Sequence, residues 1–371
     1  MMKKKRILFV SDVPDFKGGA ERSLFDLMAN PHIEPMLCVP EEGPISKAAE
    51  EKKIKFFTIK YGSVLTVRRP FKILDIFRTL KSAIHAASSL KIIAKENKVL
   101  AVHTNGLKAH GVACLARLMG GAPVIIHFRA IPFTQPEKLF WQCVRLIASH
   151  VILVSRPCWP TRHLPGNVKV IFNGIHLPDP GMVPKPDNRD PFVIGFIGRL
   201  QFTKGVDTLI EWFRYARTQG LNVRLVIRGE AAPDERAYEE KCRALVQGFN
   251  LSDVCVFEGK VEGFSKIYGG IHVNAVPSVV PDPLPRSVME ACALGIPVLG
   301  YPAGGIPYMF EDKKSGFLVK DAQQFHDTLK MLMGDIASYN SVSKAAITNA
   351  QKNFDMQRLH EEVWRVYKTL L

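Results

Sequence analysis

The chain has 371 residues, of which 47% are hydrophobic and 23% charged, a composition typical of a folded globular protein with two or three domains. No run of roughly 18 apolar residues is present, which excludes a membrane-spanning helix, and the short apolar run after the basic start predicts a first strand instead of a signal peptide. The seven cysteines are scattered without a C-x-x-C pair, which favours a reduced, cytoplasmic protein and argues against a disulfide framework or structural zinc site.

The net charge of +15 is confined to the N-terminal half. Residues 1–178 contain 27 Lys and Arg against 12 Asp and Glu, whereas residues 179–371 contain 23 of each. Such asymmetry predicts an anionic partner for the N-terminal half, and nucleic acid and the anionic face of a membrane are the usual candidates.

Short apolar runs alternate with longer amphipathic stretches along the first half, a pattern typical of βα units and parallel sheets. The predicted strands are 7–11, 36–40, 55–59, 99–103, 124–128, 151–154 and 169–172. The predicted helices between them include 19–30, 73–95 and 109–119. Dense Pro and charge then predict a linker over residues 179–191.

The same pattern restarts after the linker. The predicted strands are 192–198, 224–228, 254–258, 271–276, 298–301 and 316–319. The predicted helices are 206–218, 234–248, one that follows Ser287, and two that close the chain at 321–332 and 356–371. We therefore predict two doubly wound domains, 1–178 and 192–355, with a ligand site in a cleft between them.

Residues 277–298, PSVVPDPLPRSVMEACALGIPV, place two acids at the mouth of a strand–loop–helix unit. Asp282 lies in the loop, and Glu290 is expected in the first turn of the helix. Ligands of open α/β sheets bind beyond the carboxyl ends of the strands, where a carboxylate can accept both hydroxyls of a ribose. In the alternative interpretation, Ser287 and Glu290 form a capping box, and Glu290 only satisfies backbone N–H groups.

A second loop places two cations at the carboxyl end of a strand. Arg199 and Lys204 follow strand 192–198 and precede the helix that begins after Gly205. A pyrophosphate would be held there by the two charges and by the free N–H groups of the helix N-terminus. The alternative is a solvated loop in which Gly205 only turns the chain.

Several motifs in this order resemble the family 4 glycosyltransferases, which are retaining, metal-independent enzymes of the GT-B architecture. In the C-terminal half they are GFIGRLQFTKGVDTLIEWF and PDPLPRSVMEACALGIPVLGYPAGGIPYMFEDKKSGFLV, and in the N-terminal half GGAERSLFDLMAN and VIFNGI. The final helix, MQRLHEEVWRVYKTLL, is also similar to that of the family, where it crosses back to the N-terminal domain. The resemblance therefore implies that residues 356–371 pack on domain 1–178.

The resemblance also implies catalytic roles for four residues. Arg199 and Lys204 would neutralise the donor diphosphate and stabilise the leaving nucleotide, where negative charge develops. Glu290 would accept the ribose hydroxyls, and Asp282 would hold hydroxyls of the transferred sugar. Asp282 is a departure from the family pattern, because the family generally has the longer Glu there.

Gly18 and Gly19 match the family's glycine loop, which approaches the donor phosphates and the acceptor. Small residues there let the backbone come close to a ligand, and the following helix supplies N–H donors. The alternative is a plain turn from strand to helix.

Pro285 is a second departure, since the family commonly has Gly at this position. Proline cannot donate a backbone N–H, so one donor contact is lost. The N–H groups of Leu284, Arg286 and Ser287 remain as substitutes for binding the substrate.

The stretch PVIIHFRA, residues 123–130, is similar to a family strand that ends in Thr-x-His near the transferred sugar. Arg129 takes the His position and His127 the Thr position. Arg129 is expected to point into the cleft as a ligand of sugar, phosphate or acceptor. His127 is equally well explained as a histidine satisfied within the core, and so is His103 at the end of strand 99–103.

Residues 68–98 contain eight Lys and Arg against two acids, Asp75 and Glu96. These charges are interleaved with the apolar residues Phe71, Leu74, Phe77, Leu80 and Ile84. This pattern is typical of a basic amphipathic helix on an anionic membrane surface, and equally of a helix that packs on its own sheet and exposes a basic face.

Together these features favour a retaining hexosyltransferase that moves a sugar from a nucleoside-diphosphate sugar to a cell-surface glycan or lipid-linked saccharide, as in polysaccharide or lipopolysaccharide biosynthesis. It would act in the cytoplasm or at the inner face of the membrane. No cofactor or metal is expected, because the nucleotide sugar is a substrate and no D-x-D pair is present.

Two alternatives remain. A nucleotide-sugar epimerase of the same fold would need no acceptor half, which fits the charge asymmetry less well. A basic nucleic-acid-binding protein would contain a recognisable module, and none is visible in the sequence. A dinucleotide oxidoreductase is disfavoured, because no G-x-G-x-x-G follows the first strand.

Overall fold

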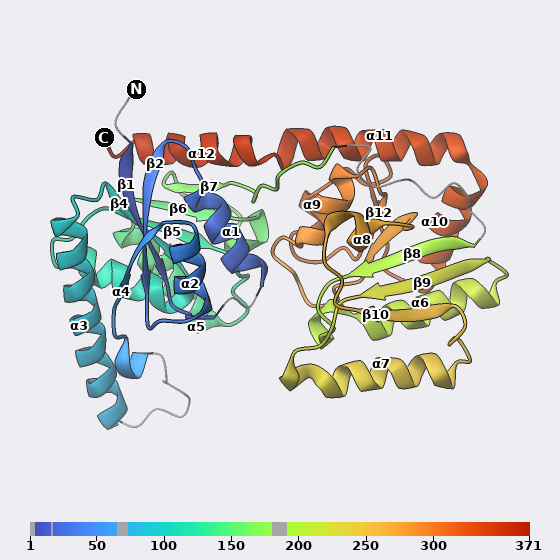
Figure 1. Cartoon of the computed structure of the whole chain (residues 1–371), viewed down its shortest axis with the longest axis horizontal. Helices are drawn as coiled ribbons and strands as arrows, with labels where there is room; N and C mark the ends of the chain where they lie inside the picture. Colours follow the sequence, from blue (N-terminus) through green and yellow to red (C-terminus); the bar gives the residue numbers. More distant parts are fainter. Residues whose placement is uncertain (1–3, 16–17, 65–72, 180–190) are drawn as a thin grey trace. The chain divides into compact units, whose positions relative to one another are not determined.

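The computed structural model describes residues 4–15, 18–64, 73–179 and 191–371, and the chain divides into two compact units (Figure 1). The first unit comprises Met1–Gly174 and Met356–Leu371, and the second comprises Ile175–Asp355. Most of the predicted linker, residues 180–190, lies outside the described residues. Each unit is a parallel sheet with helices packed against it, which confirms the predicted α/β fold class.

In the described part of the first unit, seven strands form a sheet in the order β3-β2-β1-β4-β5-β6-β7, and neighbouring strands pair in parallel. The strands are β1 (Lys5–Ser11), β2 (Ile33–Val39), β3 (Lys55–Thr58), β4 (Ala101–Asn105), β5 (Val124–Phe128), β6 (His150–Leu153) and β7 (Val168–Val170). The helices are α1 (Gly19–Met28), α2 (Pro44–Glu51), α3 (Ile73–Glu96), α4 (Leu107–Leu118), α5 (Gln135–Ile147) and α12 (Met356–Lys368).

The second unit contains a six-stranded sheet in its described residues, in the order β10-β9-β8-β11-β12-β13. Its strands are β8 (Phe192–Ile197), β9 (Val223–Arg228), β10 (Cys255–Gly259), β11 (Val273–Val276), β12 (Val298–Gly300) and β13 (Phe317–Leu318). The helices are α6 (Val206–Thr218), α7 (Arg236–Gly248), α8 (Phe264–Tyr268), α9 (Arg286–Ala293), α10 (Ala322–Gly334) and α11 (Ile336–Asn353).

The central strands are buried on both faces, so they read in the sequence as continuous apolar runs. In each sheet the strand order reverses once, between β1 and β4 in the first unit and between β8 and β11 in the second. These reversals are the topological switch points at which ligands of doubly wound sheets bind. Loops that follow β1, β4, β8 and β11 are therefore the first places to look for a site.

The final helix, α12, belongs to the first unit, although it follows α11 of the second. Its buried residues Met356, Leu359 and Val363 join the core formed by β1, β2 and α1. Asn30 fixes the contact by donating its side-chain N–H to the backbone oxygen of His360 at 2.8 Å. The hydrophobic stripe of this helix thus completes the core of the first unit.

The structure corrects the prediction that two helices close the chain after β13, because α11 lies between them. Its sequence is rich in Ser and Asn, which weakens a helical prediction made from propensity. Small buried residues at helical spacing hold it in place, including Ser343, Ala346 and Ala350, and Asp335 caps its first turn. Helices α2 and α5 were likewise not among those predicted.

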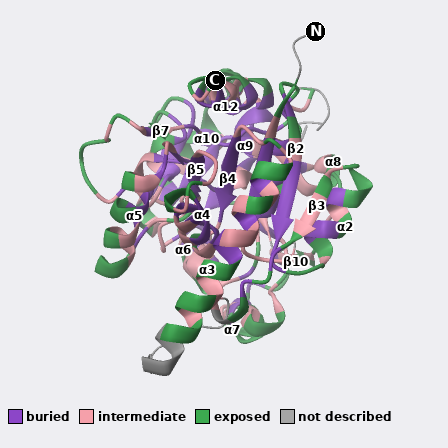
Figure 2. Ribbon diagram, turned by 90° about the vertical axis from the view of Figure 1, so that its left-hand side faces the viewer, coloured by how far each residue is buried: buried purple, intermediate pink, exposed green. Residues whose placement is uncertain are grey.

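Helix α3 presents two different faces. Ala86, Ala87 and Leu90 are fully buried, whereas Phe77 and Leu80 are 68% and 53% exposed. In Figure 2, the ribbon of α3 is coloured by burial and includes exposed residues, drawn in green. The stretch predicted to be a basic amphipathic helix begins at 68, so residues 68–72 of it lie outside the described residues. Within the described part of the chain, no helix is both long and apolar enough to cross a membrane.

Candidate active site

In the second unit, two loops leave the adjacent strands β8 and β11 at the same edge of the sheet. They bring together two of the predicted catalytic residues, because Lys204 Nζ forms an ion pair with Asp282 Oδ2. Both side chains are partly accessible, with 24% of Lys204 and 13% of Asp282 exposed. A cation and a carboxylate therefore lie side by side at the switch point, where a ligand can reach both.

Glycines hold these two loops close together. Gly205 has φ 68°, and a Cβ atom there would lie 2.3 Å from the backbone oxygen of Pro277. Gly304 has φ 59°, and its Cβ would lie 2.3 Å from the backbone oxygen of Asp282. The N–H of Gly305 donates to that same oxygen at 2.7 Å. Side chains at Gly205 and Gly304 are excluded by both conformation and space, so these glycines position Lys204 and Asp282.

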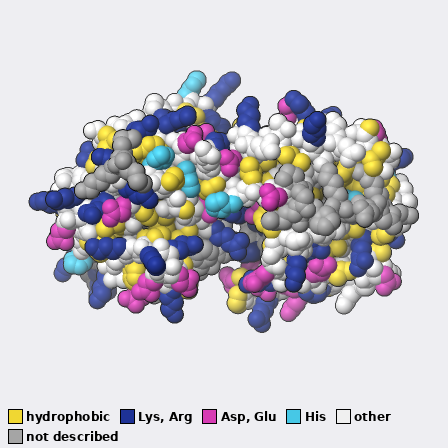
Figure 3. Space-filling view, turned by 45° about the horizontal axis from the view of Figure 1, so that its top comes forward, with side chains coloured by type: hydrophobic (Ala, Val, Ile, Leu, Met, Phe, Trp, Pro, Cys, Tyr) yellow, Lys and Arg dark blue, Asp and Glu magenta, His cyan; other side chains and the backbone are white. Residues whose placement is uncertain are grey.

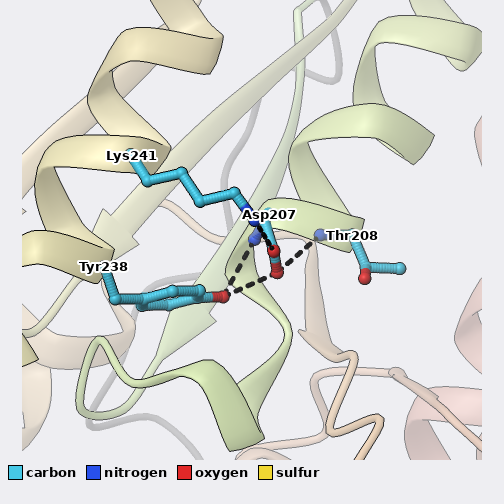
Figure 4. Close-up of polar contacts among 4 residues, drawn as sticks. All are labelled: Asp207, Thr208, Tyr238 and Lys241. Atoms are coloured by element: carbon cyan, nitrogen blue, oxygen red, sulfur yellow. Dashed lines mark hydrogen bonds and ion pairs between the residues drawn. The ribbon is translucent and has the colours of Figure 1, made fainter.

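The start of α6, directly after Gly205, is anchored to α7 by Asp207 (Figure 4). Asp207 accepts hydrogen bonds from Tyr238 Oη at 2.7 Å and from Lys241 Nζ at 2.8 Å. Burial would raise the pKa of Asp207, but the hydrogen bonds from Lys241 and Tyr238 lower it below its ordinary value. Asp207 therefore stays ionised and fixes the helix that carries the cationic loop.

Glu290 does not cap its helix, so the capping-box interpretation is wrong. Helix α9 begins at Arg286 after the N-cap Pro285, which places Glu290 beyond the first turn in which it was expected. Its oxygens accept one hydrogen bond each, from Tyr268 Oη at 2.8 Å and from Arg286 Nε at 2.9 Å. A carboxylate has about four acceptor positions, so each oxygen of Glu290 can accept one more hydroxyl.

The other predicted residues of this unit differ in their surroundings. Arg199 is exposed at the start of its loop and forms no ion pair with a described residue. The N–H of Leu284 donates to Asp282 Oδ1 at 3.1 Å, so it already has the acceptor that a substrate was expected to provide. Ser287 lies in the first turn of α9, and its backbone oxygen accepts from Asn274 Nδ2 at 3.4 Å.

In the first unit, Gly18 and Gly19 open α1 after β1. The N–H of Gly18 donates to Glu21 Oε2 at 2.8 Å, which satisfies one of the free donors of this helix. A Cβ atom on Gly19 would meet nothing within 4 Å, and its φ is not left-handed. The fold itself therefore does not require glycine at position 19, in contrast to position 205.

His127 and Arg129, at the end of β5, belong to one hydrogen-bonded network. Arg129 Nη2 lies 3.3 Å from His127 Nδ1, and Arg129 Nη1 donates to Asn173 Oδ1 at 2.8 Å. His103 Nε2 lies 3.1 Å from His127 Nδ1, and His103 Nδ1 lies 2.7 Å from Tyr367 Oη on α12. His103 sits in the middle of β4 and not at its end, because β4 extends to Asn105.

Burial controls the protonation of this network. It lowers the pKa of His103 to about 3 and that of His127 well below its ordinary value, and the nearby charge of Arg129 acts in the same direction. Burial also lowers the pKa of Arg129 to about 10, while Asp26 and Glu21 on α1 partly offset the effect. At neutral pH both histidines are therefore neutral, and Arg129 is a cation.

Three residues that no sequence motif marked contact the predicted ones: Tyr268, Asn173 and Tyr367. Tyr268 and Tyr367 are fully buried. Burial raises the pKa of both well above the ordinary value, so both remain protonated hydrogen-bond donors. No motif distinguishes them from tyrosines of the core, and only their position in the fold reveals the contacts.

Two parallel-sheet domains with these strand orders define the GT-B architecture. Comparisons with known proteins support this fold class. Residues 183–349 match the family model for glycosyl transferases group 1. The crystal structure of Anabaena HepE in complex with UDP covers 98% of this chain and is itself covered completely, with a TM-score of 0.81 at 20% sequence identity. The matched residues thus fall within the second unit, and the match agrees with the resemblance that the sequence motifs indicated.

Two curated relatives match this chain over about half of their own length. The capsular polysaccharide biosynthesis glycosyltransferase CapM of Staphylococcus aureus is 25% identical over 184 residues, which are 49% of this chain and 47% of CapM. The putative colanic acid biosynthesis glycosyltransferase WcaL of Escherichia coli K12 is 28% identical over 190 residues, which are 48% of this chain and 46% of WcaL.

Proposed function

We propose that this protein is a retaining, metal-independent hexosyltransferase that uses a nucleoside-diphosphate sugar as donor. The observation that carries the proposal is the ion pair between Lys204 and Asp282, formed by loops from the two strands at the switch point of the second unit. A cation that can bind a diphosphate thus lies beside an acid that can bind sugar hydroxyls. The UDP complex of HepE makes uridine diphosphate the first nucleotide to test.

In the proposed reaction, the bond between the anomeric carbon and the β-phosphate oxygen breaks, and its electron pair leaves with the nucleoside diphosphate. The acceptor hydroxyl oxygen bonds to the anomeric carbon from the same face, and its proton passes to the leaving diphosphate oxygen. Arg199 and Lys204 stabilise the charge that develops on the diphosphate. Glu290, already oriented by Tyr268 and Arg286, accepts the ribose hydroxyls with its remaining lone pairs.

Binding of intact nucleotide sugars tests this assignment most directly. A panel that includes UDP-glucose is titrated into the full chain and into the Lys204→Ala and Glu290→Ala variants, and affinity is measured by calorimetry. Each substitution removes charge-assisted hydrogen bonds, so we expect binding to weaken roughly tenfold or more. The exposed residues Lys344 and Glu240 provide matched controls as alanine variants.

Either of two results would refute the donor site: no nucleotide sugar binds, or both variants bind like the parent and like the controls. Analysis of the products separates transfer from epimerisation. A transferase releases nucleoside diphosphate when a saccharide acceptor is present, whereas an epimerase returns an intact nucleotide sugar.

We also propose that the acceptor is a cell-surface glycan or its lipid-linked precursor, approached at an anionic membrane surface. The names of CapM and WcaL place those relatives in polysaccharide biosynthesis. The exposed face of α3 supports the membrane contact, because Phe77, Leu80 and Ile92 are more than half exposed and share the helix with Arg78 and Lys81. Lys and Arg side chains also spread over the face drawn in Figure 3, with Asp and Glu among them.

Vesicles of anionic and of neutral lipid test the membrane contact. A chain with Phe77→Ser and Leu80→Ser should sediment less with anionic vesicles, since apolar burial and charge attraction act together there. Exchanging the similarly exposed Ile336 and Leu371 for Ser is the control. Equal sedimentation of both variants would contradict this contact and leave the donor site unaffected.

A further inference from the structure

We propose that Arg129 binds an anionic oxygen group of the saccharide substrate, a phosphate or a carboxylate, and that the chain Tyr367–His103–His127 holds it in the binding orientation. This inference rests on the proposed transferase function and specifies the class of its substrate. Arg129 directly follows β5, so it lies at the carboxyl edge of the sheet where ligands of this fold bind.

The hydrogen-bond directions in this chain follow from Arg129. A guanidinium can only donate, so His127 Nδ1 accepts from Arg129 Nη2, and the proton of neutral His127 resides on Nε2. His103 Nε2 must then be the donor toward His127 Nδ1. The other nitrogen of His103 carries no proton and accepts from Tyr367 Oη. Arg129 thus sets the tautomers of both histidines, and the Tyr367 hydroxyl on α12 completes the chain as the donor to His103.

The partners of Arg129 orient it without cancelling its charge. They are an amide oxygen of Asn173 and an imidazole nitrogen of His127, both neutral. Within the described residues no carboxylate forms an ion pair with Arg129, although Asp26 and Glu21 act on it from a greater distance. A direct carboxylate partner would have satisfied the cation, whereas these neutral acceptors leave its charge for a ligand.

Two N–H groups of this network are buried and have no acceptor among the described residues: Arg129 Nε and His127 Nε2. A buried donor without a partner is costly, so such groups need an explanation. A guanidinium has five N–H donors, and the two contacts above use one on each terminal nitrogen. An oxygen-rich anion offers acceptors for the remaining ones.

Anion titrations followed by NMR test the proposal in the full chain. The chain carries Arg199→Ala and Lys204→Ala, so that phosphate cannot bind at the donor site. Inorganic phosphate and acetate are titrated separately, and the signal of Arg129 Nε–H, assigned with Arg129→Lys, is followed. Long-range correlations of the imidazole nitrogens report the tautomers of His103 and His127.

We expect a saturable shift of the Arg129 signal with one of the two anions, and the stronger of the two titrations identifies the charged group. Tyr367→Phe should weaken that affinity roughly fivefold or more, as for the loss of one orienting hydrogen bond. Tyr215→Phe is the matched control, because it removes a tyrosine hydrogen bond to Gln323 in the second unit. The control should bind like the parent.

The proposal is overturned if neither anion shifts the Arg129 signal, if His127 carries its proton on Nδ1, or if Tyr367→Phe binds as tightly as the control. These outcomes are distinct from failure of the donor site, which is measured with UDP-glucose on the chain that retains Arg199 and Lys204. A chain that binds UDP-glucose but shows no Arg129 shift would lose this inference alone.

Discussion

In the second unit, Lys204 lies against the carboxylate of Asp282 and Arg286 lies against that of Glu290, whereas in the first unit Arg129 is held by an amide and an imidazole. A cation paired with a carboxylate must exchange that carboxylate for the ligand on binding. In the free protein, the carboxylate already offsets the cost of burying the cation. A cation held by neutral groups is ready for its ligand, but its burial destabilises the free protein. The two units therefore face different trade-offs between stability and binding.

Acidification should produce the largest difference in stability between the two units. Burial lowers the pKa of His103 and His110 to about 3, and it lowers that of His127 well below its ordinary value. Unfolded histidines titrate near 6.5, so below that pH the unfolded state binds more protons, and stability falls as pH falls until the folded groups also titrate. Below about pH 6.5, each buried histidine lowers the free energy of unfolding by up to about 1.4 kcal/mol per pH unit. The three together lower it by up to about 4 kcal/mol per pH unit.

Hydrogen exchange between pH 7 and pH 5, corrected for intrinsic rates, measures this difference. Amides of β4 and β5 should lose protection sooner than those of β8 and β9. The variant His110→Phe should reduce the loss, whereas His163→Gln, at an exposed position, should not. Equal loss of protection in both units would contradict the assignment of neutral buried histidines.

The next largest effect is expected for Gly205→Ala in the second unit. Alanine at φ 68° is strained, and its Cβ would clash with the backbone oxygen of Pro277, so we expect a loss of about 1–3 kcal/mol in the free energy of unfolding. Gly248→Ala is the control, because that helical position has open space and gains helix propensity. Denaturant unfolding compares the two, and similar stabilities would refute the loop constraint.

Asp282→Asn tests whether the ion pair of the second unit competes with the substrate. Without the carboxylate, Lys204 has no charge partner in that loop, and repulsion of the diphosphate falls. We expect UDP to bind a few fold more tightly, by about 0.5–1 kcal/mol, while sugar transfer slows. Calorimetry with UDP and a transfer assay measure the two effects. Weaker UDP binding would mean that Asp282 helps to hold the nucleotide.

The smallest change in stability is expected for Gly19→Ala, where a Cβ has open space. The free energy of unfolding should change by less than about 1 kcal/mol. Transfer activity should nevertheless fall if the Gly18–Gly19 backbone approaches a ligand. Full activity in this variant would support the alternative of a plain turn from strand to helix.

These sites also indicate how far sequence can predict structure here. The strands and their division between two domains followed from apolar runs, since strands buried on both faces leave a clear pattern, whereas their order within each sheet was not predicted. The pairing of Lys204 with Asp282 could also be predicted from the sequence. Both follow strands of one parallel sheet, and such loops gather at one edge.

The partners that orient these residues were not predictable in this way. Tyr268 is 22 positions from Glu290, Asn173 is 44 from Arg129, and Tyr367 is 264 from His103. A single hydrogen bond across such separations leaves no periodic pattern in the sequence. Helix α11 was missed for another reason, because packing of small residues holds it together in spite of a composition with weak helix propensity.

The position of α12 has a consequence for synthesis of the chain on the ribosome. The second unit, Ile175–Asp355, is continuous in sequence, so its core needs no residue from the segments that flank it. The first unit begins earlier but ends later, because its core needs Met356, Leu359 and Val363 of α12. Until those residues emerge, the apolar surface of β1, β2 and α1 that they cover stays exposed to water. The first unit therefore cannot complete its core until the segment that follows the second unit has been translated.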